Sequence, residues 1–278
     1  MRKPKRQGSQ RSAERRVGLA RALSKLGYCS RSEAAERIRA GEVTLNGSIT
    51  RNPEAPVRLG SDRIAVGGEP VGAKAKVYWM MNKPRGVATT AGDEKGRQTV
   101  YDLLFEGAGS EGLPWIAPVG RLDKASEGLL LFTNDSEWAA KVTSPDSHLD
   151  KTYYVQIDAV GDDSLLRSLE AGICAKDGER LRAKRATLLR AGQKNSWLVV
   201  ALDEGKNRQI RRMLEALKLE VLQLVRVAIG PLALGDLPKG TARPLTAQEK
   251  AALDQAIRAA SSEPTSPATR ESSSEWDR

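Results

Sequence analysis

One carboxylate in this chain stands where a nucleophile could act. Asp123 follows Arg121 in the segment Val119–Asp135 and comes just before an apolar run, Gly128–Phe132. This run predicts a buried strand, so Asp123 lies on the irregular segment that leads into the strand. Loops on a rigid scaffold often carry function, and we therefore place the chemistry at Asp123.

Asp123 lacks the recognisable partners of the common hydrolytic sites. A glycosidase needs two carboxylates across its substrate, a hydrolytic triad needs Ser or Cys with His, and a metal site needs clustered ligands. The chain has only Cys29, Cys174 and His148 of the cysteine and histidine types, far apart in sequence. This spacing favours a reducing compartment, and we expect neither a metal nor a cofactor.

A second candidate segment, Lys151–Ile157, alternates as a strand does, which places Lys151 and Tyr153 on one face with Val155 and Ile157. A tyrosine on an apolar strand face is more often a core residue than a functional one. From this pattern alone both interpretations of Tyr153 stay open.

A third segment follows the predicted strand Trp197–Ala201. Helical spacing gives one apolar face and one polar face; the apolar residues are Ile210, Met213, Leu214 and Leu217, and the polar ones are Arg208, Arg211, Arg212 and Glu215. Arginines in the first turns oppose the helix dipole and repel one another, each effect being roughly a few tenths of a kcal/mol. The arrangement indicates an anionic partner.

The order of these motifs resembles that of the pseudouridine synthases of the ribosomal-RNA branch. The matching elements are Gly-Arg-Leu-Asp ending at Asp123, Lys-Pro-x-Gly at Lys83–Gly86, Lys-x-Tyr ending at Tyr153, and Gly-x-x-x-Gln-Ile-Arg at Gly205–Arg211. The resemblance implies that Asp123 is the nucleophile, that Tyr153 packs against the target uracil and that Arg211 pairs with the catalytic carboxylate.

The resemblance also implies a set of substrate contacts. Arg121, beside the nucleophile, is expected to fill the space that the displaced base leaves. The other predicted substrate-binding residues are Lys83, Lys151, Asn207 and Arg208. Pro84 and Gly86 are expected to be structural, because proline ends strand pairing and glycine permits a tight turn. The segment Gly92–Leu113 is predicted to be a mobile excursion over the site.

The N-terminal region predicts two short helices and a hairpin. Gly27 ends the first helix, Ser30 and Glu33 form a capping box for the second, and an Asn-Gly turn joins two strands within Val43–Ile49. This order resembles the S4 RNA-binding domain over residues 17–65. We predict that four cations face an RNA backbone: Lys25, Arg31, Arg37 and Arg39. For each of them, a purely solvent-facing role on a helix stays an alternative.

The charge distribution favours a polyanionic partner. The 278-residue chain has a formal net charge of +10, and residues 1–16 hold seven Lys or Arg against one Glu. A basic body with a basic arm is typical of nucleic-acid binding. The arm and the tail, residues 259–278, are predicted to be disordered. No apolar run long enough for a membrane span and no secretory signal occur, so we expect no membrane partner and a cytoplasmic location.

These patterns predict an α+β protein with an S4-like domain and a pseudouridine synthase domain built on a largely antiparallel, mixed sheet. The expected boundaries are a disordered basic arm at 1–16, the S4-like domain at 17–65, a linker at 66–76, the catalytic domain at 77–258 and a disordered tail at 259–278. The expected partner is ribosomal RNA or a pre-ribosomal particle, bound by a monomer, with large-subunit RNA favoured over small-subunit RNA. The alternative is a non-catalytic RNA-binding ribosome-assembly factor.

Overall fold

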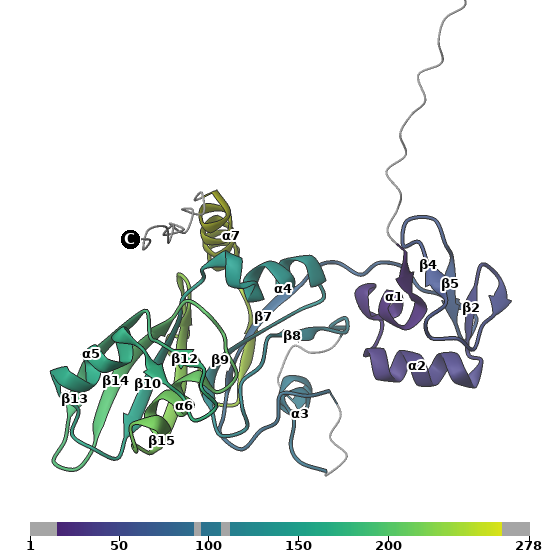
Figure 1. Cartoon of the computed structure of the whole chain (residues 1–278). Helices are drawn as coiled ribbons and strands as arrows, with labels where there is room; N and C mark the ends of the chain where they lie inside the picture. The colour runs from purple at the N-terminus through teal and green to yellow at the C-terminus, as the bar shows by residue number, and fades with distance from the viewer. Residues whose placement is uncertain (1–15, 92–95, 107–111, 263–278) are drawn as a thin grey trace, which may run out of the picture. The chain divides into compact units, whose positions relative to one another are not determined.

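The computed structural model describes residues 16–91, 96–106 and 112–262 (Figure 1). The chain divides into two compact units, Met1–Ala139 with Leu237–Pro244, and Ala140–Asp236 with Leu245–Arg278. Residues 1–15 of the predicted arm and 263–278 of the predicted tail lie outside the described residues. Each unit is an α+β structure, as the sequence predicted.

The first unit begins with a small domain of two helices and short strands. Helices α1 (Leu19–Lys25) and α2 (Arg31–Ala40) share one apolar core with a four-stranded antiparallel sheet of order β3-β2-β5-β6 (Figure 1). The strands are β1 (Val17–Gly18), β2 (Val43–Leu45), β3 (Ser48–Ile49), β4 (Pro56–Val57), β5 (Ile64–Val66) and β6 (Glu69–Pro70), with β1 paired to β4. Strand β6 lies within the segment that the sequence predicted as linker.

Local sequence signals set the ends of these elements. The Ser30 hydroxyl accepts a hydrogen bond from the Glu33 N–H at 3.1 Å, which caps α2. Gly41 ends α2 in the left-handed region, with φ of 83°. Asn46 and Gly47, with φ of 53° and 86°, make the turn between β2 and β3. The predicted caps and hairpin are confirmed.

The rest of the first unit is built around the buried strand β9 (Glu127–Thr133). It pairs antiparallel with β7 (Tyr78–Lys83) along its length and with β8 (Ala117–Val119) at its C-terminal end. On its other edge β7 pairs antiparallel with β17 (Ala242–Pro244), which comes from near the end of the chain. Every side chain of β9 is buried, as its apolar sequence predicted.

Helix α3 (Val100–Glu106) corrects one expectation. It lies within the segment 92–113 that the sequence predicted as a mobile excursion, of which residues 92–95 and 107–111 lie outside the described residues. Val100, Tyr101 and Leu104 are buried, and the Tyr101 ring stacks on Trp115 at 4.7 Å between centroids. The prediction of a mobile segment was wrong for α3. The helix is short, and the many glycines and charged residues around it in the sequence concealed the helical spacing of its apolar residues.

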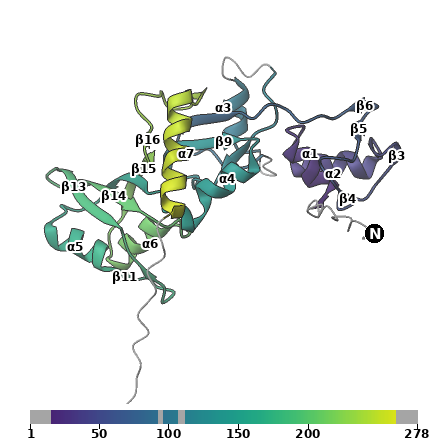
Figure 2. The same ribbon diagram turned by 90° about the horizontal axis from the view of Figure 1, so that it is seen from above.

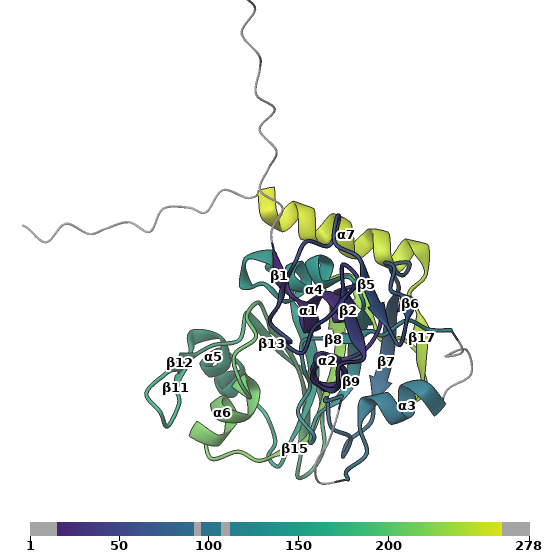
Figure 3. The same cartoon turned by 90° about the vertical axis from the view of Figure 1, so that its right-hand side faces the viewer.

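The second unit is an antiparallel sheet of order β13-β14-β10-β15-β16. Two of its helices lie beside β13 and β15, on one side of them (Figure 3). Its strands are β10 (Lys151–Ile157), β13 (Arg185–Ala191), β14 (Ser196–Leu202), β15 (Val221–Ile229) and β16 (Leu232–Ala233). Helices α5 (Asp163–Ala171) and α6 (Gln209–Ala216) share a core with these strands, and the hairpin of β11 (Ile173–Cys174) and β12 (Arg180–Leu181) adjoins them.

Three further helical segments occur among the described residues. They are α4 (Ser136–Thr143), the 3-10 turn η1 (Pro145–Ser147) and α7 (Ala247–Ser262), which runs beside β16 (Figure 2). A capping box begins α7, since the N–H groups of Thr246 and Glu249 bond reciprocally to each other's side chains at 2.8 and 3.1 Å. The helix continues to Ser262, beyond the predicted start of the tail. None of the helices described here has the length and apolar character of a membrane span.

Candidate active site

Asp123 is half-buried on the loop that leads into β9, and the backbone of this loop is held in place. The Thr89 hydroxyl donates a hydrogen bond to the Leu122 carbonyl at 2.8 Å. The Gly86 N–H donates to the Lys124 carbonyl, also at 2.8 Å. Gly86 has φ of 93°, which confirms the predicted tight turn and lets its N–H reach the loop. The residues on both sides of Asp123 are therefore tied to the segment that follows β7.

Lys83, the last residue of β7, ties the same loop from inside. Its side chain is fully buried, and Nζ donates to the carbonyls of Pro84 at 3.1 Å, Asp123 at 3.2 Å and Ser126 at 2.8 Å. An ammonium has three N–H donors, so these three carbonyls use all of them. This geometry supports a role for Lys83 in positioning the Asp123 loop rather than in contacting the substrate.

Burial also changes the protonation of Lys83. It lowers the pKa of Lys83 from 10.5 to about 8, while the carboxylates of Glu127 and Asp123 favour the charged form. At neutral pH the ammonium is therefore charged and makes its three hydrogen bonds, but it loses its proton within the mildly alkaline range.

Arg121 lies on the same loop as Asp123 and its side chain is exposed. Gly120, just before it, has φ of 75°, a left-handed conformation that glycine adopts without strain. Arg121 is thus at the surface two residues from the candidate nucleophile, a position compatible with its predicted contact to the substrate.

Tyr153 lies on β10 in the second unit, on the face that the sequence predicted. Its ring packs against the core that contains Val155 and Ile157, whereas Tyr154 is exposed on the opposite face. The strand register pairs Tyr153 with Arg226 of β15. Arg226 is only 6% exposed, so it is a buried cation beside the candidate uracil-packing residue.

Lys151 adds a second cation to this neighbourhood. Burial lowers the pKa of Lys151, and Arg226 lowers it further, while Asp150 and Asp203 oppose the shift. Two cations that influence each other in a partly buried position favour an anion nearby. Arg226 was not among the predicted site residues, although it is the one charged residue within the strand Val221–Ile229.

The turn into α6 presents two of the predicted substrate contacts. Asn207 and Arg208 are both exposed. Arg208 is the N-cap of α6 and has φ of 48° and ψ of 32°, a left-handed conformation that costs a non-glycine residue about 1 kcal/mol. Strained residues of this kind cluster at binding and catalytic sites, which supports a functional role for the turn.

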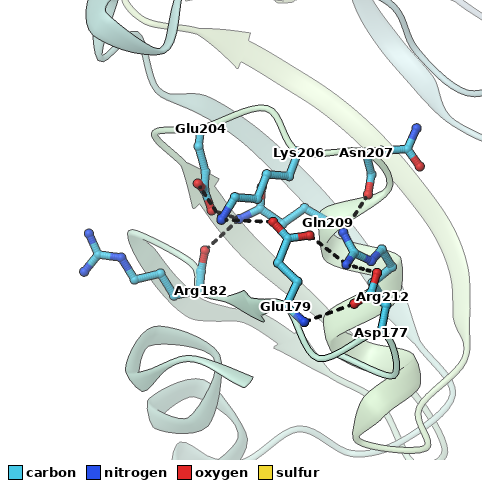
Figure 4. A network of polar contacts seen from close by, with 8 residues as sticks. All are labelled: Asp177, Glu179, Arg182, Glu204, Lys206, Asn207, Gln209 and Arg212. Carbon is cyan, nitrogen blue, oxygen red and sulfur yellow. Dashed lines mark hydrogen bonds and ion pairs between the residues drawn. The ribbon is translucent and has the colours of Figure 1, made fainter. Parts of the chain in front are cut away.

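Arg212 has its anionic partners within the chain (Figure 4). Its guanidinium forms ion pairs with Asp177 and with Glu179, the latter at 2.8 Å. Lys206 contacts Glu179 at 3.4 Å and Glu204 at 3.0 Å in the same network. The arginine-rich pattern therefore indicated an anion correctly, but for Arg212 that anion belongs to the β11–β12 hairpin, and an external partner is not needed to explain this residue.

Gln209 anchors the start of α6 from below the turn (Figure 4). It is almost fully buried, and Nε2 donates to the Arg182 carbonyl at 2.9 Å and to Glu204 Oε1 at 2.7 Å. Arg211 is half-buried two residues later, with Nη1 donating to the Val221 carbonyl at 3.4 Å. Asp123 belongs to the first unit and Arg211 to the second, so their pairing stays a prediction.

The four candidate RNA-binding cations of the small domain differ in their surroundings. Arg37 contacts Glu33 at 3.1 Å and Glu42 at 3.4 Å, and its guanidinium lies over the Tyr28 ring. The hydrogen bond that Arg37 Nε donates to the Glu33 carboxylate is the main cause that raises the pKa of Arg37. The other three are the half-buried Lys25 and the exposed Arg31 and Arg39. Arg31 and Arg39 are the best placed to reach phosphates.

Comparison with known proteins matches both domains. Residues 17–64 match the S4 domain, and residues 77–216 match the family described as RNA pseudouridylate synthase. A solved structure described as a pseudouridylate synthase superposes with a TM-score of 0.58 at 29% identity, covering 85% of this chain and 99% of that one. The chain belongs to the RNA pseudouridine synthase family and is therefore an isomerase that acts on RNA.

The similarity extends over nearly the whole length of individual relatives. The chain is 40% identical over 234 residues to ribosomal large subunit pseudouridine synthase B of Bacillus subtilis (strain 168), which covers 83% of this chain and 93% of the relative. An uncharacterized RNA pseudouridine synthase of Aquifex aeolicus (strain VF5) is 34% identical over 243 residues, covering 87% and 95%. The chain thus shares both domains and their order with these enzymes.

Proposed function

We propose that this protein converts a uridine of large-subunit ribosomal RNA to pseudouridine, with Asp123 as the nucleophile. The observation that carries the proposal is the loop geometry, in which Thr89, Gly86 and Lys83 fix the backbone around one half-buried carboxylate. The name of the Bacillus subtilis relative supports large-subunit RNA as the substrate. Small-subunit RNA is the second candidate.

The reaction breaks the N-glycosidic bond of the uridine, turns the uracil and joins it to the ribose through carbon. No atom is gained or lost, so the chemistry needs a group that assists bond cleavage and a pocket that keeps the free base in place. An ionised Asp123 can attack the sugar or promote departure of the base, and both routes require its negative charge. A cation such as Arg211 close to Asp123 would favour that charge.

The second unit supplies the groups proposed to hold the base and its backbone. Tyr153 is proposed to pack against the uracil, and the cations Lys151 and Arg226 near it suit the neighbouring phosphate. Asn207 and Arg208 are proposed to contact the substrate from the strained turn before α6. A base within a helix is unreachable, so the target must be unpaired or flipped out at a cost of a few kcal/mol, and Arg121 is proposed to fill the vacated space.

The setting of the reaction follows from charge and domain content. The net charge of +10 and the S4 domain support ribosomal RNA or a pre-ribosomal particle as the partner. We further propose that the chain acts as a monomer in the cytoplasm.

The test replaces Asp123 by Asn, which keeps the shape of the side chain but removes its charge. Pseudouridine formation is measured by tritium release from 5-tritiated uridine in transcribed ribosomal RNA, and RNA binding is measured alongside. We expect no detectable product from Asp123→Asn and binding within about threefold of the unaltered protein, because phosphate contacts dominate affinity.

The matched control is Asp163→Asn, which removes the same charge from an exposed position in the first turn of α5. We expect this variant to keep full turnover. Turnover by Asp123→Asn at the unaltered rate would remove Asp123 from the mechanism.

A separate experiment identifies the target uridine: pseudouridines are mapped in the ribosomal RNA of cells with and without the gene.

A further inference from the structure

Glu127 is a buried carboxylate that the bond-making chemistry does not use. It is the first residue of β9 and follows the Asp123 loop, and its side chain is only 5% exposed. Its Oε2 lies 2.6 Å from the Nζ of Lys239. Burying an ionised carboxylate costs several kcal/mol unless cations and hydrogen bonds compensate, so its position calls for a physical reason.

The segment that carries Lys239 is held against the end of β7. Asn82 Nδ2 donates to the Leu237 carbonyl at 2.7 Å. The Gly240 N–H donates to the Asn82 carbonyl at 2.8 Å, and the Asn82 N–H donates to the Thr241 carbonyl at 3.0 Å. Lys239 is therefore placed over Glu127 by backbone contacts to the residue that precedes Lys83.

Glu127 is also close to Lys83 in the sheet, because it directly precedes Gly128, which pairs with Lys83 across β7 and β9. The carboxylates of Glu127 and Asp123 are the charged groups that favour the ammonium form of Lys83, and Glu127 contributes the larger effect. The charge state matters because three carbonyls converge on Nζ. A neutral amine has only two N–H donors, so it would leave one carbonyl facing its lone pair.

We propose that Glu127 is a positioning residue for the pseudouridine synthase reaction: its carboxylate is the counter-charge that keeps the Lys83 ammonium bonded to the Asp123 loop, and Lys239 covers this carboxylate from solvent. The proposal rests on the proposed role of Asp123 as nucleophile. The competing explanation is that Glu127 and Lys239 only pin the 237–241 segment to β9. The two explanations differ in what they predict for the pH dependence of turnover.

The experiment measures single-turnover pseudouridine formation, and its dependence on RNA concentration, from pH 6.5 to 9.5 with the full-length protein and transcribed ribosomal RNA. The unaltered protein is expected to lose activity above the pKa of Lys83, about 8. We call this decline of the rate at high pH the alkaline limb. In Glu127→Gln the alkaline limb should lie roughly one pH unit lower, because Lys83 loses a neighbouring negative charge. The rate at pH 8.5 should then fall roughly eightfold with KM within about twofold.

Two further variants separate positioning from simple packing. Glu127→Asp keeps the charge and should return the alkaline limb to within about half a pH unit of the unaltered protein. Glu137→Gln, the matched control, removes the same charge from an exposed site in the first turn of α4 and should leave the limb unchanged. The uridine ionises alike in every reaction, so differences between variants report on the protein.

An alkaline limb in Glu127→Gln that coincides with that of the unaltered protein would overturn the inference and leave the Asp123 assignment intact. Inactivity of the unaltered protein would instead overturn the proposed function. If Glu127→Gln fails to fold in a thermal melt, Lys239→Gln provides the test, since it keeps the carboxylate and changes an exposed side chain. Its limb should lie at or above that of the unaltered protein, and a lower limb would contradict the proposal.

Discussion

Replacing Lys83 by Met separates the stability of the fold from the placement of the catalytic loop. Met keeps an unbranched apolar stem of similar volume in the buried site but has no N–H donor. The carbonyls of Pro84, Asp123 and Ser126 lose their common partner. We expect a protein that is folded but less stable than the unaltered one, and severely impaired in turnover.

Two opposing effects set the stability of the variant. Three lost hydrogen bonds from a charged donor cost about 1.5 to 3 kcal/mol each, roughly 5 to 9 kcal/mol in total. Burial of the ammonium, which lowers its pKa from 10.5 to about 8, corresponds to roughly 3 kcal/mol that the variant no longer bears near pH 7. The unfolding free energy should therefore fall by roughly 2 to 6 kcal/mol. Turnover should fall about a hundredfold or more, because displacing a reacting group by about 1 Å has effects of that size.

The pH dependence gives the same residue a second test. The pKa of Lys83 is lower in the fold than in the unfolded chain, so the unfolded state binds more protons between about pH 8 and 10.5. Across this window the unaltered protein should gain stability relative to Lys83→Met as pH rises. Its turnover should fall over the same range, so stability and activity should change in opposite directions.

The assay pairs single-turnover pseudouridine formation with denaturant unfolding of both proteins at pH 7 and pH 9.5. Lys141→Met, which changes an exposed lysine in the last turn of α4, is the control and should retain the unaltered rate. If Lys83→Met is folded under the assay conditions and its rate is within about threefold of the unaltered protein, the three hydrogen bonds do not position the catalytic loop.

Two further predictions concern the arginines. Arg211→Met should lower the single-turnover rate more than RNA affinity, because its proposed partner is the Asp123 carboxylate; a large loss of binding at an unchanged rate would make it a backbone contact instead. The double variant of Arg31→Gln and Arg39→Gln should reduce the slope of log affinity against log salt by roughly 1.5 to 2, while the internally paired Arg37 changed to Gln should reduce it less. Equal slopes for the double variant and the unaltered protein would show that these residues do not engage phosphates.

Features set by neighbours in sequence were the ones that could be predicted. Three examples are the cap at Ser30, the turn at Asn46 and the face of β10 that carries Tyr153. Each depends only on residues that are close to one another in the sequence. The position of Asp123 before a buried strand was equally visible, because β9 is apolar throughout. The roles implied by the family resemblance could be attached to these positions because the motifs occur in the expected order.

Features set by distant partners could not be predicted. Glu127 and Lys239 are 112 residues apart in the sequence, so neither residue type indicates that the other covers it. Lys83 lies at the end of a strand and was predicted to contact the substrate, but its side chain is fully buried. Arg212 was predicted, with Arg208 and Arg211, to face an anionic partner. In the structure it forms ion pairs with Asp177 and Glu179 of the β11–β12 hairpin. Burial and charge pairing of this kind follow from topology, which the local pattern does not contain.

The return of the 237–244 segment to β7 has a consequence for biosynthesis. A hydrogen bond joins Asn82 to Leu237, which lies 155 residues later in the sequence. At about 5 to 20 residues per second, the ribosome reaches Leu237 roughly 8 to 30 s after it has added Asn82. Within that interval the nascent chain comes to contain Lys83, Asp123 and Glu127 while it still lacks Lys239 and the edge strand β17. The catalytic loop can thus reach its final support only when the 237–244 segment has been translated, which delays activity until the S4 domain and most of both units are present in the same chain.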